Sequence, residues 1–69
     1  MTAQQAQALQ PGALVVSREP DCYPGARGRV VKVITFPDHR FGFVSGVAVE
    51  ISIAGGINIF IDAGKCEAI

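Results

Sequence analysis

The amino-acid sequence predicts a single small all-β domain with five short strands. Its apolar residues are mainly β-branched, with eight Val and seven Ile against two Leu and one Met. Such side chains pack well on extended backbone, whereas helical cores use more Leu and Met. Eight Gly and four Pro separate the apolar runs, as turns require. At 69 residues the chain has room for one domain only.

The first elements are a tail, a strand and a long loop. Residues 1–11 are rich in Gln and Ala and are expected to form a flexible N-terminal tail, because isolated helices this short are marginal in water. The domain then covers residues 12–69. Its first strand is predicted over residues 13–18. A loop with two Pro and two Gly follows over residues 19–28.

The second strand is predicted over residues 29–36 and carries large apolar side chains on both faces. Val31 and Val33 share one face, and the other holds Val30, Ile34 and Phe36. A lone small domain would leave one of these faces in water. Covering about 300 Å² of it would contribute about 7 kcal/mol at about 25 cal/mol per Å². The sequence therefore predicts a homo-oligomer or an obligate partner.

In the rest of the chain, apolar residues alternate clearly with polar or small ones. After a predicted turn at residues 37–42, a third strand begins at Phe43, and from Val47 to Ile53 every second residue is large and apolar, which is the period of a half-buried strand. Residues 54–56 form a hairpin whose Gly-Gly pair supplies positive φ. The fourth strand, residues 57–61, is expected to direct its isoleucines inward and Asn58 and Phe60 outward. A 3₁₀ turn over residues 62–66 and a short fifth strand are expected to close the sheet.

The composition also argues against several classes of protein. Six basic and six acidic residues cancel, which argues against nucleic-acid binding driven by counterion release. No apolar run approaches the roughly 18 residues of a membrane span, and the start of the chain lacks the features of a secretory signal. Cys22 and Cys66 are expected to be free thiols in a reducing cytoplasm, with a disulfide as the alternative in an exported chain. With His39 as the only histidine, they make no metal site.

The order of the predicted elements carries a resemblance at the level of the fold. A Pro11-Gly12 entry, a strand, a long loop, three more strands, a 3₁₀ turn and a last Ile follow one another. This order resembles an SH3-like barrel, which implies a five-stranded barrel over residues 12–69. Residues 25–33, Gly-Ala-Arg-Gly-Arg-Val-Val-Lys-Val, are similar to a KOW-type element. That similarity implies, as an alternative, a nucleic-acid-binding module using Arg27, Arg29, Lys32 and Arg40.

A narrower resemblance lies in the last third of the chain. Gly46-Val47-Ala48-Val49-Glu50, a Gly-ending hairpin, Ile57-Asn58-Ile59-Phe60 and a final Glu67-Ala68-Ile69 follow in order. They are similar to the plasmid-borne type II dihydrofolate reductases, homotetramers of SH3-like barrels around a central pore with a Val-Gln-Ile-Tyr motif. Here the amide is one methylene shorter and the phenol hydroxyl is absent. The resemblance implies an oligomeric NADPH-dependent reductase acting through Asn58 and Phe60, with Arg18 nearby.

Two candidate surfaces emerge. The loop at 19–28 and the turn at 37–42 are expected to bind a protein partner, because aromatic residues beside Arg are typical of interfaces. The residues of this surface are Tyr23, Arg27, Arg29, His39, Arg40 and Phe41. An oligomer or pore face is expected from Asn58, Phe60, Val31 and Val33. The alternative for the basic residues is a solvated strand edge.

No catalytic residues are predicted, because the chain has one His and lacks a nucleophile elbow or a phosphate-binding Gly loop. The leading hypothesis is a small non-enzymatic interaction module that self-associates, binds a protein partner and needs no cofactor. The reductase, with NADPH, and the nucleic-acid-binding module are the alternatives.

Overall fold

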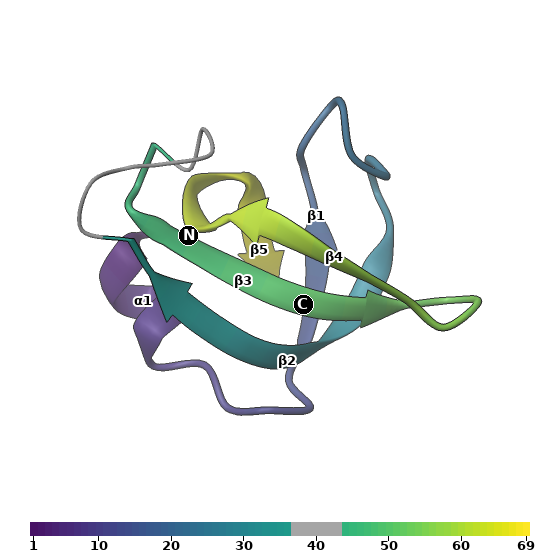
Figure 1. The fold of residues 1–69 in the computed structure, drawn as a ribbon, viewed down its shortest axis with the longest axis horizontal. Coiled ribbons are helices and arrows are strands. Elements are labelled where there is room, and N and C mark those ends of the chain that lie inside the picture. The colour runs from purple at the N-terminus through teal and green to yellow at the C-terminus, as the bar shows by residue number, and fades with distance from the viewer. Residues whose placement is uncertain (37–43) are drawn as a thin grey trace.

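The computed structural model describes residues 1–36 and 44–69, and in them the chain forms a strongly curled antiparallel sheet with one short helix (Figure 1). The helix is α1 (Ala3–Gln7). The five strands are β1 (Leu14–Ser17), β2 (Arg27–Thr35), β3 (Val47–Ile53), β4 (Ile57–Asp62) and β5 (Cys66–Ala68), in the spatial order β4-β3-β2-β1-β5. A 3₁₀ turn, Ala63–Lys65, joins β4 to β5. The all-β prediction with five strands and a terminal 3₁₀ turn is confirmed.

The sheet does not close, which corrects the expectation for the last strand. All three residues of β5 pair with β1, where Val15 lies opposite Ala68 and Ser17 opposite Cys66. Within the described part of the chain, no ladder joins β5 to β4. The 3₁₀ turn carries the chain from the end of β4 across to β1, where the three residues of β5 pair, so β5 does not run along β4. The molecule is therefore a curled sheet with two free edges.

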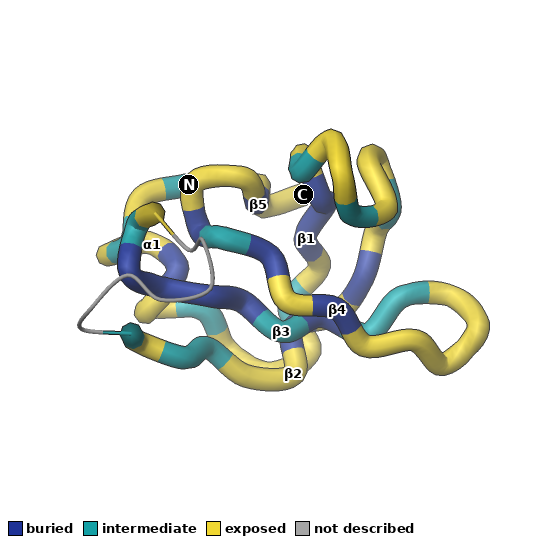
Figure 2. Tube along the Cα trace, turned by 45° about the horizontal axis from the view of Figure 1, so that its top comes forward, coloured by how far each residue is buried: buried dark blue, intermediate teal, exposed yellow. Residues whose placement is uncertain are grey.

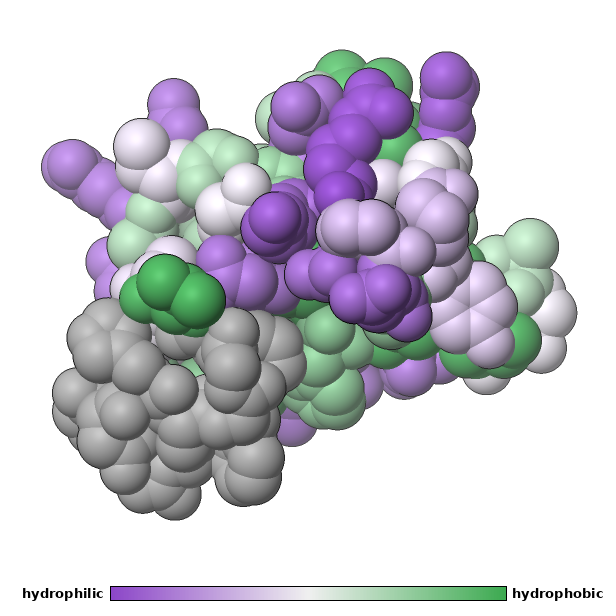
Figure 3. Space-filling model, turned by 90° about the horizontal axis from the view of Figure 1, so that it is seen from above, coloured by the Kyte–Doolittle hydropathy of each residue, from purple (hydrophilic) through white to green (hydrophobic). Residues whose placement is uncertain are grey.

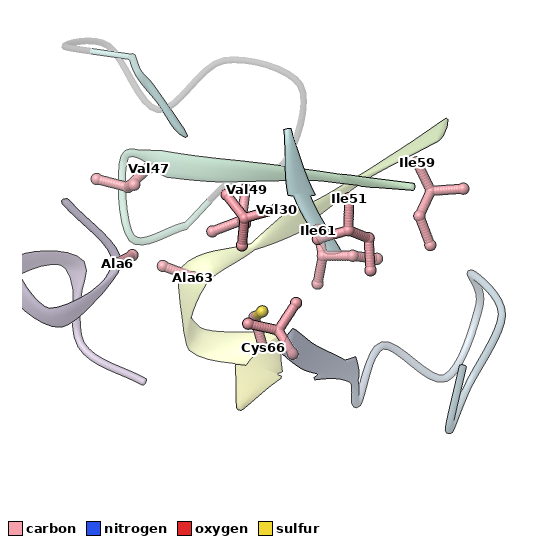
Figure 4. Close-up of a cluster of buried hydrophobic side chains, with 10 residues drawn as sticks. Ala6, Val30, Val47, Val49, Ile51, Ile59, Ile61, Ala63 and Cys66 are labelled. Atoms are coloured by element: carbon pink, nitrogen blue, oxygen red, sulfur yellow. The ribbon is translucent and has the colours of Figure 1, made fainter. Parts of the chain in front are cut away.

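The hydrophobic core lies on the concave side of this sheet, and the alternation read from the sequence holds there. The largest fully buried apolar side chains come from three strands: Val15, Val49, Ile51 and Ile61. Figure 4 shows Ile51, Ile59 and Ile61 beside one another, with Val49, Ala63 and Cys66 farther along the same core. In Figure 2 the buried positions run along β3, and the β3–β4 hairpin is largely exposed. Ala48, predicted for the outer side, is also fully buried; it lies between Ile34 and Asp62 in the neighbouring strands.

A β-bulge in β2 changes which of its apolar residues face outward. The pairing of β2 with β3 shifts between Val30 and Lys32, so Val31 is the extra residue. An extra residue moves the following side chains to the opposite face. Val30 is buried, Val33 packs against the core, and Val31 is 40% exposed. Of the two valines predicted to share an outer face, only Val31 lies on the surface, because the simple alternation stops at the bulge.

The N-terminal residues, predicted as a tail, are packed on the domain. Thr2 caps α1 in a capping box: its hydroxyl accepts from the Gln5 amide, and the Gln5 side chain accepts from the Thr2 amide. Ala6 is fully buried in the core, and the amino group of Met1 donates to the carbonyls of Ala63 and Cys66. A helix of five residues gains its stability from such packing rather than from its own propensity.

The β3–β4 hairpin has the turn that the Gly-Gly pair predicts. Gly55 and Gly56 have φ values of 85° and 75°, a region that residues with a side chain rarely enter. The turn aligns Ile53 with Ile57 and so sets the register of the whole β3–β4 ladder. As a result Ile59 and Ile61 are buried, whereas Asn58 and Phe60 are exposed, as predicted. Ile57, at the end of the hairpin, is 39% exposed.

Candidate functional site

The convex side of β2, β3 and β4, which we call the outer face, holds the best-defined group of polar and apolar side chains. Strand pairing places Lys32 opposite Glu50 and Glu50 opposite Phe60. In the next row, Arg29 lies opposite Ser52 and Ser52 opposite Asn58. Residues directly opposite one another in antiparallel strands share a face. The outer face therefore combines two cations, a carboxylate, an amide and an aromatic ring.

Glu50 is the polar centre of the outer face. One of its carboxylate oxygens lies 3.9 Å from the Lys32 ammonium nitrogen, and the other accepts a hydrogen bond of 3.4 Å from the Asn58 amide. The Glu50 side chain is only 13% exposed, whereas that of Lys32 is 61% exposed. These two contacts bring side chains of three adjacent strands together on the outer face. Because both are long and Lys32 and Asn58 are exposed, they contribute little to stability.

Phe60 gives the outer face its apolar character. It is 44% exposed, although aromatic rings contribute most to stability when they are buried. Val31 at the bulge of β2 is exposed to a similar degree. Ile57 is also partly exposed, but it lies on the opposite face of β4, in line with Ile59 and Ile61, at the end of the hairpin. Figure 3 shows the molecule from above, where hydrophilic side chains fill the middle of the view and apolar ones lie toward its sides.

The loop between β1 and β2 is held by Ser17, a fully buried polar residue. The Ser17 hydroxyl donates to the carbonyl of Cys22 at 3.0 Å and accepts from the Glu19 amide at 3.3 Å. The Ser17 carbonyl accepts from the Gly25 amide at 2.8 Å. These bonds fix both ends of a predicted binding loop around one side chain. This role could not be predicted, because nothing in the sequence distinguishes Ser17 from an exposed polar residue of a strand.

Tyr23 is presented at the tip of that loop. Its φ of 49° lies in the left-handed region, which is uncommon for a residue with a bulky side chain. Its carbonyl accepts from the Ala26 amide at 3.0 Å, and its side chain is 49% exposed. Arg27 begins β2 directly after this turn and is exposed. Arg27 therefore follows the turn that begins at Tyr23, but as the first residue of β2, so the predicted loop over residues 19–28 ends two residues too late.

Arg29, also predicted for the partner surface, lies away from this turn. Arg29 donates to the Gly12 carbonyl at 2.9 Å, and strand pairing assigns it to the row of Ser52 and Asn58 on the outer face. His39, Arg40 and Phe41, together with the predicted turn at 37–42, lie outside the described residues.

A surface hollow lies where α1 meets β5. It has a volume of about 510 Å³ and is lined by Met1, Gln5, Leu9, Glu67 and Ala68. The hollow could not be predicted from the sequence, because it forms only where the N-terminal residues pack beside β5. It is open and lacks a cluster of charged groups, so it has no evident chemistry of its own.

Both cysteines are free, and Cys66 is fully buried. Burial raises the pKa of the Cys66 thiol above its ordinary value of 9.0; the N-terminal amino group opposes this shift and Glu67 adds to it. The raised pKa means that the folded state holds this proton more tightly than the unfolded chain does.

We expect this thiol to make the domain sensitive to alkali. The stabilisation from the protonated thiol is complete below pH 9.0, where the unfolded chain is also protonated, and is lost as the pH rises through the higher pKa of the folded state. Urea unfolding at pH 8 and pH 10 measures the effect. Cys66→Ala should be less stable at pH 8 but should lose less free energy of unfolding between the two pH values than the unchanged protein. An equal loss in both proteins would contradict the assignment.

No helix among residues 1–36 and 44–69 has the length and apolar character needed to cross a bilayer. Comparisons with protein families, with curated proteins and with solved structures found no match to this chain. The function must therefore be argued from the surfaces described above.

Proposed function

We propose that this protein is a small non-enzymatic interaction module that self-associates through the outer face and the adjoining strand β4. The observation that carries the proposal is the exposure of Phe60, 44%, beside the polar side chains of Lys32, Glu50 and Asn58, which contact one another across three strands. An exposed aromatic ring surrounded by polar groups is typical of association surfaces.

The loop between β1 and β2 is the surface at which a protein partner would bind. Tyr23 and Arg27 are exposed at one turn, and the Ser17 hydrogen bonds hold that turn in place. Tyrosine and arginine are among the residues that contribute most often to binding energy at interfaces. Because a held turn loses little conformational entropy on binding, this loop suits recognition of a folded protein surface.

Substitution of Phe60 should weaken self-association. Light scattering after size exclusion at micromolar concentration is expected to give a particle mass that is a multiple of the 7.2 kDa chain. Phe60→Ser should weaken association by about tenfold or more, since burial of part of an aromatic ring contributes about 1.4 kcal/mol or more. Leu14→Ser is the matched control, because Leu14 is also 44% exposed but lies on β1.

Two results would contradict the proposal. The unchanged protein would remain a single chain at all concentrations tested, or Leu14→Ser would weaken association as much as Phe60→Ser. Turnover of dihydrofolate with NADPH by the assembled protein would instead contradict its non-enzymatic part and support the reductase.

A further inference from the structure

The two free edges of the sheet differ in how they are protected. The β5 edge is three residues long, its Cys66 carbonyl already accepts from the Met1 amino group, and the N-terminal residues lie beside it. The β4 edge is six residues long, and no backbone hydrogen bond joins it to any other described segment than β3. Free edges are usually guarded by charged residues, Pro, bulges or covering segments. Only one of the two edges here has such protection.

The backbone groups that β4 presents can be assigned from its turn. Three residues, 54–56, connect Ile53 to Ile57. Ile53 and Ile57 must form a directly hydrogen-bonded pair. If they were a non-hydrogen-bonded pair, the next pair toward the turn, Ala54 and Gly56, would have to be hydrogen-bonded, and a single residue would then have to reverse the chain. Bonded pairs alternate along an antiparallel ladder. Asn58 and Phe60 therefore direct their amide and carbonyl groups away from β3, toward the free edge.

The residues of this edge fit a second copy of the same strand. From Ile57 to Ile61 the strand has no charged residue and no Pro, so two copies bring no like charges together. The whole chain also has a net charge of zero, which removes long-range repulsion between copies. Asp62 stands at the end of the strand, where its carboxylate accepts from Ser45 and Gly64 and is thus satisfied within its own chain.

We infer that the self-association proposed above occurs by antiparallel pairing of β4 with β4 of a second copy, in a register centred on Ile59, which joins two five-stranded sheets into one of ten strands. A two-fold axis through this point sets Asn58 opposite Phe60 of the partner subunit. The two chains then exchange four backbone hydrogen bonds through these residues. The buried faces of both sheets stay on the same side, as register in a half-buried sheet requires. The two aromatic rings come into diagonal contact on the outer face. This inference rests on the proposed function and adds the geometry of the contact.

Proline at position 58 tests the pairing directly. Asn58→Pro removes an outward amide from each chain, and its ring obstructs the approach of the other strand; proline is tolerated where an edge amide faces solvent. We expect dimerisation to weaken by about 100-fold, because two hydrogen bonds of the symmetric pair are lost. Asn58→Ala is the comparison variant, because it removes the same side chain but keeps the backbone amide. Any loss that both variants share belongs to the side chain, and strand pairing requires Asn58→Pro to weaken dimerisation at least about tenfold more than Asn58→Ala does.

Hydrogen exchange of the unchanged protein provides the second measurement and needs no variant. In the dimer the amides of Asn58 and Phe60 should be protected, and dilution to the monomer should make them exchange freely. If Asn58→Pro still dimerises, and the amides of Asn58 and Phe60 exchange freely in the dimer of the unchanged protein, strand pairing is overturned but self-association is not. A protein that is monomeric throughout would overturn both. If Asn58→Pro fails to fold, the exchange result decides alone.

Discussion

Replacing Ile51 by Ala is expected to lower the free energy of unfolding by about 3 to 4 kcal/mol. Ile51 is, with Ile61, one of the two largest fully buried side chains among the described residues, and it lies on β3 with neighbours from β2 and β4. The loss combines the transfer free energy of three carbon atoms with the cost of the cavity that they leave. A domain of this size has a total stability of only about 5 kcal/mol. A single truncation therefore removes most of its stability.

Urea unfolding followed by circular dichroism measures this effect. Ile57→Ala is the matched control, because it makes the same chemical change on a side chain that is 39% exposed at the hairpin end. Its cost should remain below about 1.5 kcal/mol. Equal losses for the two variants would show that the core is not centred on β3.

Gly28→Val is expected to cost about 3 kcal/mol or more. A Cβ atom at this position would lie 2.6 Å from the backbone oxygen of Ser52 and 3.0 Å from a methyl group of Ile53. The Ser52 oxygen belongs to the neighbouring strand β3, so relief requires β2 and β3 to separate. Glycine is needed here for space, since its φ is not in the left-handed region.

Thermal and urea unfolding of this variant should be compared with Arg27→Val. Arg27 is the preceding residue of β2 and is exposed, so valine there should change stability by no more than about 0.5 kcal/mol. A Gly28→Val protein as stable as Arg27→Val would mean that β2 and β3 do not approach as closely at this point as described.

The parts of the fold that could be predicted are those where local pattern and tertiary structure agree. Val49 and Ile51 alternate with polar or small residues, and the Gly-Gly pair marks the following turn, so the inward and outward sides of β3 and its hairpin with β4 could be predicted. The predicted start of the third strand at Phe43 is too early, because Val44 lies in a turn and β3 begins at Val47. The bulge at Val31 could not, because β2 is apolar on both faces and its register depends on pairing with β3. The packing of α1 was missed for a similar reason. Its capping residues, Thr2 and Gln5, are visible in the sequence, but its stability comes from contact with the core.

The candidate surfaces were predicted less completely. The outward directions of Asn58 and Phe60 follow from strand period alone and are confirmed. The position of Arg29 in the same row as Asn58 depends on two ladders at once, which no local pattern encodes. The left-handed conformation of Tyr23 likewise depends on a turn that Ser17 holds from a distance in the chain. Residues that act through pairing or buried hydrogen bonds are the ones that sequence patterns miss.

The hydrogen bonds around Ser17 separate the β1–β2 loop from the rest of the fold. Ser17 bonds to Ala26 and Gly25 at the base of the loop, so the segment between Arg18 and Pro24 is attached to the sheet as a closed unit. The solvent-facing residues of this segment can therefore vary without altering the strand pairing, whereas the Cys22 carbonyl must keep its place to satisfy the buried Ser17 hydroxyl. The loop thus has one fixed internal point and an otherwise tolerant sequence.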